Sequence, residues 1–121
     1  MGDYRKLVVW QRSHSLTVAI HRVLRASRVP WPGGLSEQLA AAVHSIGANI
    51  AEGSNQSPPQ FARYLSIAMG STDEAWVHVL LASDLDLLDD TATGMLNELR
   101  EIRAMLFALR SKVRQDYRQS S

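Results

Sequence analysis

The 121-residue sequence contains no cysteine. Without cysteine, a disulfide framework, a thiolate metal site and a cysteine nucleophile are all excluded. No apolar run approaches the roughly 18 residues that a membrane span needs. The segment from Met1 to Gln11 contains no apolar core of signal-peptide length. We therefore expect a cytoplasmic protein with no membrane partner.

Strand-like alternation, internal repeats and low-complexity tracts are also absent from the sequence. Hydrophobic residues make up 45% of the chain and charged residues 21%, and both shares are ordinary for a globular protein. A chain of this length and composition has room for one domain, which we expect to span residues 1–121.

Four segments repeat apolar residues at the spacing of an amphipathic helix. They predict helices over about 8–28, 36–53, 58–88 and 94–118. Because short connections favour antiparallel neighbours, the predicted fold class is all-α, a single up-and-down antiparallel four-helix bundle. The two longest stripes are Phe61, Leu65, Ala68, Thr72, Ala75, Val79 and Ala82, and Met95, Leu99, Ile102, Leu106, Leu109 and Val113.

Prolines and glycines mark the predicted helix ends. Two prolines and two glycines between residues 30 and 34 cannot continue a helix. Gly53 is expected to end the second helix in the left-handed conformation. Ser57 followed by Pro58 is typical of a capped helix start. The polar segment 89–94 then connects the third helix to the fourth.

The third predicted helix is apolar on more than one face. A helix of a monomeric bundle is polar on its outward side, whereas excess apolar width indicates burial against another molecule. We therefore predict an oligomer interface formed by Met69, Trp76, Leu80 and Leu87. Gly47 and Gly70 fall inside predicted helices, where each costs about 1 kcal/mol relative to alanine. We expect close approach of a neighbouring helix backbone to offset this cost.

Chemically active groups do not converge in this sequence. His14 and His21 lack a carboxylate at metal-ligand spacing. Di-iron bundles carry a Glu-x-x-His motif on each of two facing helices, whereas this chain has only the single pair Glu74 and His78, four residues apart. The acidic run 84–90 lacks the spacing of an EF-hand loop. We predict no catalytic residue, no metal and no cofactor, and hence a protein that is not an enzyme.

Several polar or small residues lie at or beside the apolar stripes of the second and third helices. A polar residue at a core position costs stability unless it is hydrogen-bonded, but it specifies register and partner choice. We favour this structural and assembly role over catalysis or ligand binding for Asn49, Glu52, Gly70, Ser71 and Glu74.

The charge is distributed unevenly along the chain. Residues 1–28 hold six basic residues and one acidic, residues 29–90 one basic and eight acidic, and residues 91–121 six basic and three acidic. Two interpretations are open: neighbouring helices attract one another, or the basic segments form a face for an anionic partner.

The run from Ser45 to Gly53 resembles a motif of bacterial four-helix bundle proteins. These proteins are related to those encoded in intervening sequences of 23S ribosomal RNA genes, and are also labelled as a ribosomal protein family. The resemblance covers roughly residues 4–90. Its other matching positions are Tyr4, Leu7, Val9, Trp10, Gln11, Gln38, Phe61, Tyr64, Leu65, Ala68, Gly70, Ser71, Glu74 and the stretch from Leu81 to Leu88.

This resemblance implies an up-and-down bundle that assembles as a ring-like homopentamer. The accessory protein of diversity-generating retroelements is more distantly similar in fold and assembly, and it binds nucleic acid and a reverse transcriptase. By analogy, RNA or another nucleic acid becomes a candidate partner. The present sequence departs from the family at residues 39–42, where members often carry two arginines and this chain has none.

Our leading hypothesis is a homo-oligomeric binding or scaffold module whose partner, besides further copies of itself, is RNA or another nucleic acid. Phosphate contacts would come from a basic face of Arg5, Lys6, Arg12, Arg22, Arg25, Arg28, Arg110, Lys112, Arg114 and Arg118. The alternative is a protein–protein interaction adaptor that binds no nucleic acid and uses an exposed Trp31 with its apolar rim. No small-molecule substrate is indicated.

Overall fold

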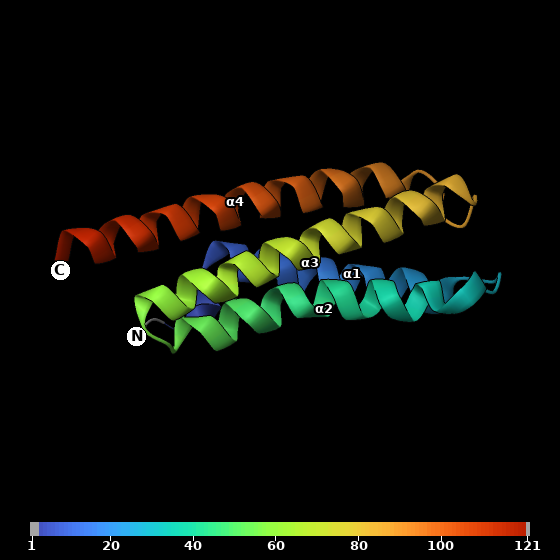
Figure 1. Ribbon diagram of the computed structural model, residues 1–121. Helices are drawn as coiled ribbons and strands as arrows, with labels where there is room; N and C mark the ends of the chain where they lie inside the picture. The colour runs from blue at the N-terminus through green and yellow to red at the C-terminus, as the bar shows by residue number, and fades with distance from the viewer. Residues whose placement is uncertain (1–2, 121) are drawn as a thin grey trace.

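The computed structural model describes residues 3–120. Residues 1, 2 and 121, which the expected domain included, lie outside the described part. The structure consists mainly of long α-helices that lie alongside one another (Figure 1). They are α1 (Val8–Ala26), α2 (Leu35–Ser54), α3 (Pro58–Asp84) and α4 (Thr91–Ser120), with short 3-10 segments η1 (Tyr4–Lys6) and η2 (Pro32–Gly34). No strand occurs within residues 3–120.

The helices pack in the order in which they follow along the chain. α2 lies against both α1 and α3, α3 lies against α4, and α4 closes the bundle more loosely against α1. The predicted all-α, up-and-down four-helix bundle is confirmed. Within the described residues, no helix is both long and apolar enough to cross a membrane.

The predicted apolar stripes form one core. The fully buried side chains include Ile20 of α1, Ile46 of α2, Leu65 of α3 and Ile102 of α4. Burial of this apolar surface is the main driving force that holds four separately amphipathic helices together. At the outer end of the α4 stripe, burial fades: Leu109 and Val113 are only partly covered.

One end of the bundle is longer than the rest. Figure 1 shows the last turns of α4 projecting beyond the turn that joins α2 to α3, and residues 114–120 are exposed. We call this the α4-terminal end. The opposite end holds the α1–α2 connection and the α3–α4 connection.

The prediction that Gly53 ends α2 in a left-handed conformation is wrong. Gly53 is buried inside the helix, which continues to Ser54. A Cβ built on Gly53 would lie 2.5 Å from Cβ of Tyr64 and 3.0 Å from Cδ1 of Phe61. Glycine is required here by the close approach of α3. The glycines that do have positive φ are Gly33 (57°) and Gly34 (75°), in the turn before α2.

The connection between α3 and α4 also differs from the prediction. α3 ends at Asp84, because Asp86 takes a positive φ of 59° and the amide of Leu87 donates back to the Ala82 carbonyl. This pair of features is a Schellman-type helix end. α4 begins at Thr91, three residues earlier than expected, because the Asp89 carboxylate accepts a hydrogen bond from the Thr91 amide at 3.0 Å.

Two further glycines have different surroundings from those expected. A Cβ on Gly47 would lie 3.3 Å from the indole nitrogen of Trp10, so this glycine accommodates a side chain and not a neighbouring backbone. Gly70 is exposed on α3, and apart from its own stretch of helix no described atom lies within 4 Å of its Cβ position. Nothing within the described chain therefore approaches Gly70.

Candidate nucleic-acid interface

The ten predicted basic residues do not form one face. Arg22 and Arg25 lie at the end of α1 and Arg28 in the connection just after it, at the opposite end of the bundle from the last turns of α4. Residues between 23 and 27 line a shallow groove together with residues between 87 and 91. The basic end of α1 is therefore placed near the acidic α3–α4 connection, as the attraction between neighbouring helices would require.

Arg12 is committed to contacts inside the bundle. Its guanidinium donates to the Glu98 carboxylate, with Nε 2.9 Å from Oε2, and it also pairs with Glu101. These hydrogen bonds, that of Glu98 first, raise the pKa of Arg12 above its ordinary value. Arg12 thus joins α1 to α4 and has little capacity left for a phosphate.

Other predicted basic residues also have partners. Arg5 pairs with Asp3 at 3.0 Å, and this hydrogen bond lowers the pKa of Asp3. Lys112 lies 3.5 Å from the carboxylate of Asp116, one turn later on α4.

The guanidinium of Arg110 lies against its own and a neighbouring helix. It donates to the Ser66 hydroxyl of α3 at 2.9 Å, and it lies 5.4 Å from the ring centre of Phe107. Its Nε is buried without a hydrogen-bond partner among the described residues. Arg110 is thus partly withdrawn from solvent, where α3 and α4 meet.

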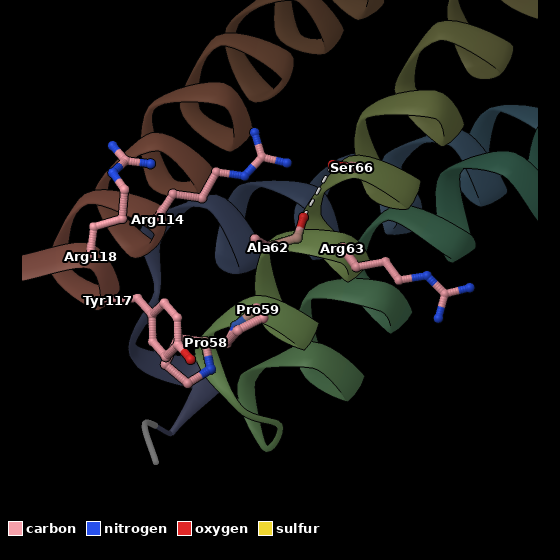
Figure 2. Close-up of a pocket in the computed structure, with 8 residues that line it drawn as sticks. All are labelled: Pro58, Pro59, Ala62, Arg63, Ser66, Arg114, Tyr117 and Arg118. Carbon is pink, nitrogen blue, oxygen red and sulfur yellow. Dashed lines mark hydrogen bonds between the residues drawn. The ribbon is translucent and has the colours of Figure 1, made fainter. Parts of the chain in front are cut away.

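A concave site lies between the start of α3 and the end of α4, and we call it the α3–α4 groove. Its volume is about 480 Å³, and its lining residues are Pro58, Pro59, Ala62, Arg63, Ser66, Arg114, Tyr117 and Arg118. Figure 2 shows the Tyr117 ring of α4 beside Pro58 in the first turn of α3, with Arg114 and Arg118 extending away from the prolines. Three of the eight lining residues are arginines and none is acidic.

The first turn of α3 shapes one wall of this groove. Ser57 caps the helix by accepting from the Gln60 amide, and two prolines follow it. Proline at the first helical positions needs no amide hydrogen bond, so its ring faces outward without a backbone penalty. Across the groove, the Tyr117 side chain is 45% exposed. The groove therefore combines an apolar floor and an aromatic ring with cationic edges.

Arg63 and Tyr117 were not among the predicted site residues. Arg63 is the only basic residue between positions 29 and 90, and this isolation was a signal that sequence analysis could have used. Arg114, Tyr117 and Arg118 lie three and four residues apart, which places them on one face of a helix. Within residues 3–120, Arg63 and Arg114 form no ion pair and no hydrogen bond.

Two of the predicted structural polar residues meet in one hydrogen-bonded cluster. The Asn49 amide donates to the Ser45 carbonyl and hydroxyl at 2.8 and 2.9 Å, and the Ser45 hydroxyl lies 2.8 Å from that of Ser71. The cluster joins α2 to α3 by side chains. In contrast, Glu52 and Glu74 are exposed, so they lie beside the apolar stripes and outside the core, and their predicted role in assembly stays a prediction.

The predicted oligomer interface is placed differently by the structure. Met69 belongs to the core of the chain itself, with 6% of its surface exposed, and Trp76 and Leu87 pack partly against that core. Only Leu80 of the four is exposed, at 44%. The outward apolar residues of α3 and its C-terminal cap form what we call the outer α3 stripe: Ile67, Val77, Leu80, Leu81 and Leu85.

Trp31 is less exposed than the adaptor hypothesis assumes. Its side chain is partly buried against the core, and its indole nitrogen donates to the Ser27 hydroxyl at 3.2 Å. A metal-binding arrangement is not seen either: within residues 3–120, no three His, Asp or Glu side chains gather as ligands.

The fold and surface together define a class of protein: a small up-and-down four-helix bundle with polar contacts between its central helices and a cationic groove at one end. The sequence model of the 23S rRNA-intervening sequence protein family matches residues 5–108. The chain belongs to that family.

The same fold is found in a solved structure of a protein of unknown function from the S23 ribosomal protein family of Bacteroides thetaiotaomicron. The two chains are 25% identical and superpose with a TM-score of 0.75, over 84% of this chain and 97% of that one. No curated protein sequence matches the chain. Arg114, Tyr117 and Arg118 follow the segment that the family model matches, so the α4 wall of the groove lies beyond it.

Proposed function

We propose that this protein is a non-enzymatic, self-associating binding module of the cytoplasm that holds RNA by its phosphate backbone at the α4-terminal end. The observation that carries the proposal is the α3–α4 groove, whose lining includes three arginines, Arg63 of α3 with Arg114 and Arg118 of α4, and no acidic residue. Arginine binds phosphate through a planar, bidentate donor array. The family name, which refers to 23S rRNA, is consistent with this partner.

Self-association is supported by the outer α3 stripe. Ile67, Gly70, Val77 and Leu81 lie on one exposed face of α3, and with Glu74 between them they follow alternating spacings of three and four residues. This spacing is the seam of a helix–helix contact. Because no other part of residues 3–120 covers Gly70, a second helix can approach the backbone of α3 closely there. We propose a homopentamer, in which each groove is repeated five times and weak contacts add by avidity.

The phosphate-binding part of the proposal is tested by titrating purified protein into labelled RNA at several salt concentrations. Binding to single strands weakens with a slope of about −0.7 for each phosphate neutralised. The double variant Arg63→Gln/Arg114→Gln is expected to bind less tightly and to show a slope shallower by about 1.4. The matched control is Arg22→Gln/Arg25→Gln at the other end, which should retain the original slope. An affinity that does not change with salt would refute the proposal.

Self-association is tested by light scattering on the eluting protein. The unmodified chain is expected to elute with the mass of five 13.4 kDa subunits. Val77→Glu/Leu81→Glu places charges on the outer α3 stripe, where both side chains are about half exposed in the single chain. The variant should stay helical and elute at a lower mass. An unchanged mass for the variant would show that subunits meet elsewhere.

The adaptor hypothesis remains as the alternative, although Trp31 is an unsuitable anchor because it is partly buried and hydrogen-bonded. Its apolar surface would have to be the outer α3 stripe. Pull-downs with and without nuclease separate the two functions, since partners held through RNA are lost after digestion and partners held directly are retained.

A further inference from the structure

The α3–α4 groove contains more than charge. Phosphate contacts need only cations, yet this site also presents the Tyr117 ring and the rings of Pro58 and Pro59. Figure 2 shows Tyr117 extending from α4 beside the first turn of α3, with Arg114 and Arg118 on the same stretch of helix. An exposed aromatic ring with arginines on the same stretch of helix provides the stacking platform and the cations that hold an unstacked base and its backbone.

The size of the groove agrees with an occupant of this kind. Its volume of about 480 Å³ lies within the range of roughly 300–1,000 Å³ that small-molecule sites occupy. A single nucleotide fits this range, with its base against Tyr117 and the proline rings and its phosphate toward Arg114. The site is open at the end of the bundle, so the strand can enter and leave on either side.

We propose that the α3–α4 groove binds one unstacked nucleotide of a single-stranded nucleic acid, with the base stacked on Tyr117 and the flanking phosphates on Arg114 and Arg118. This inference rests on the nucleic-acid binding proposed above and specifies how the nucleic acid is bound. In a duplex, each base is covered on both faces by its neighbours and cannot reach Tyr117. Single strands, loops and ends offer bases that can be splayed out and stacked on aromatic side chains.

The ribose cannot be distinguished by stacking and phosphate contacts alone. Every base has a π-face, and single-stranded RNA and DNA share the same phosphate chemistry. The 2′-hydroxyl is what separates the two at a protein site. The test therefore uses both polymers. An acidic peptide is the main competing occupant, and it would use the arginines without needing the ring.

The experiment is fluorescence anisotropy of the full chain with labelled U12, dT12 and a 12-base-pair RNA duplex at low salt. Tyr117→Ala is expected to weaken U12 and dT12 binding about fivefold or more, the effect of losing one stacked base, and to leave duplex binding unchanged. Tyr117→Phe keeps the ring and should bind as the unmodified protein does. Arg114→Gln should weaken all three, and Arg25→Gln none of them. Tyr117 projects from the exposed last turns of α4, so its replacement leaves the core intact.

The outcomes separate the two proposals. If Tyr117→Ala binds U12 as tightly as the unmodified protein while Arg114→Gln does not, base stacking is refuted and phosphate binding stands. Poly-glutamate serves as a competitor for U12. If the same concentration of poly-glutamate displaces U12 from the unmodified protein and from Tyr117→Ala, base stacking is likewise refuted. If the unmodified protein binds none of the three nucleic acids, the proposed function itself fails. A loss confined to U12, with dT12 unaffected, would show that the groove reads the ribose and would contradict the shared mode.

Discussion

Replacing Gly53 by alanine tests how closely α2 and α3 pack. Gly53 is buried, and an added Cβ would lie 2.5 Å from Cβ of Tyr64, 3.1 Å from Cγ of the same residue and 3.0 Å from Cδ1 of Phe61. The Tyr64 Cβ cannot rotate away, because it is attached directly to the backbone of α3. The helices must therefore move apart to accept the methyl group.

The magnitude follows from two opposing terms. Overpacking a core by one methyl group costs about 1–3 kcal/mol, and the 2.5 Å contact places Gly53→Ala in the upper part of that range. Exchanging glycine for alanine inside a helix contributes about 1 kcal/mol in the other direction. We expect Gly53→Ala to lower the free energy of unfolding by about 1–2 kcal/mol.

Gly70→Ala is the matched control. It makes the same exchange within a helix, but nothing lies within 4 Å of its Cβ position. Only the propensity gain remains, so Gly70→Ala should raise the stability of the folded chain by about 1 kcal/mol. If a second copy contacts α3 at Gly70, the same variant will also associate less tightly.

Urea unfolding followed by circular dichroism measures both variants. A change of 1 kcal/mol moves the midpoint by about 0.3–1 M at the m-values of small proteins. The two midpoints should therefore move in opposite directions from that of the unmodified protein. Curves recorded at two protein concentrations separate the stability of the chain from that of an assembly. A Gly53→Ala variant as stable as Gly70→Ala would refute the argument that close packing requires glycine at position 53.

Three further variants test contacts between and within helices. Arg12→Ala removes the ion pair that joins α1 to Glu98 of α4. Because these side chains are about one-third exposed, the free energy of unfolding should fall by only about 0.5–1 kcal/mol, and this difference should shrink as the NaCl concentration is raised. Asp89→Ala removes the cap on the Thr91 amide. That hydrogen bond lowers the pKa of Asp89 below its ordinary value of 3.8, so the thermal midpoint should fall at pH 7 and the difference should vanish as pH falls through the lowered pKa. Ser71→Ala breaks the hydroxyl contact with α2 and should cost about 1 kcal/mol in urea unfolding, whereas Ser71→Thr, which keeps the hydroxyl, should cost less.

The helices and their buried faces could be predicted from the sequence, because both depend on local periodicity. Residues three and four apart share a helix face whatever surrounds them. Leu65 and Ile102 were therefore identifiable as core residues, and the motif around Asn49 identified the family. Ser57 and Pro58 marked the start of α3 correctly, since a helix cap involves only neighbouring residues.

Helix ends were predicted less well where they depend on backbone conformation. Asp86 ends α3 in the left-handed region, which glycine favours and aspartate adopts only occasionally. The Asp89 cap then starts α4 early. Gly53 shows the reverse case: a residue typical of helix ends is required inside one, because another helix lies against it.

The surface was decided by tertiary structure alone. Antiparallel packing places Arg25 and Arg114 at opposite ends of the bundle and brings Arg12 to Glu98, a residue 86 positions away in the sequence. Charge counted along the chain cannot reveal these pairings, since ionic contacts depend on distance in space. Residue order and local spacing were enough to identify four amphipathic helices, the family and the absence of cysteine chemistry. Only the packing of those helices decided which arginines face carboxylates and which, with Tyr117, border an open groove.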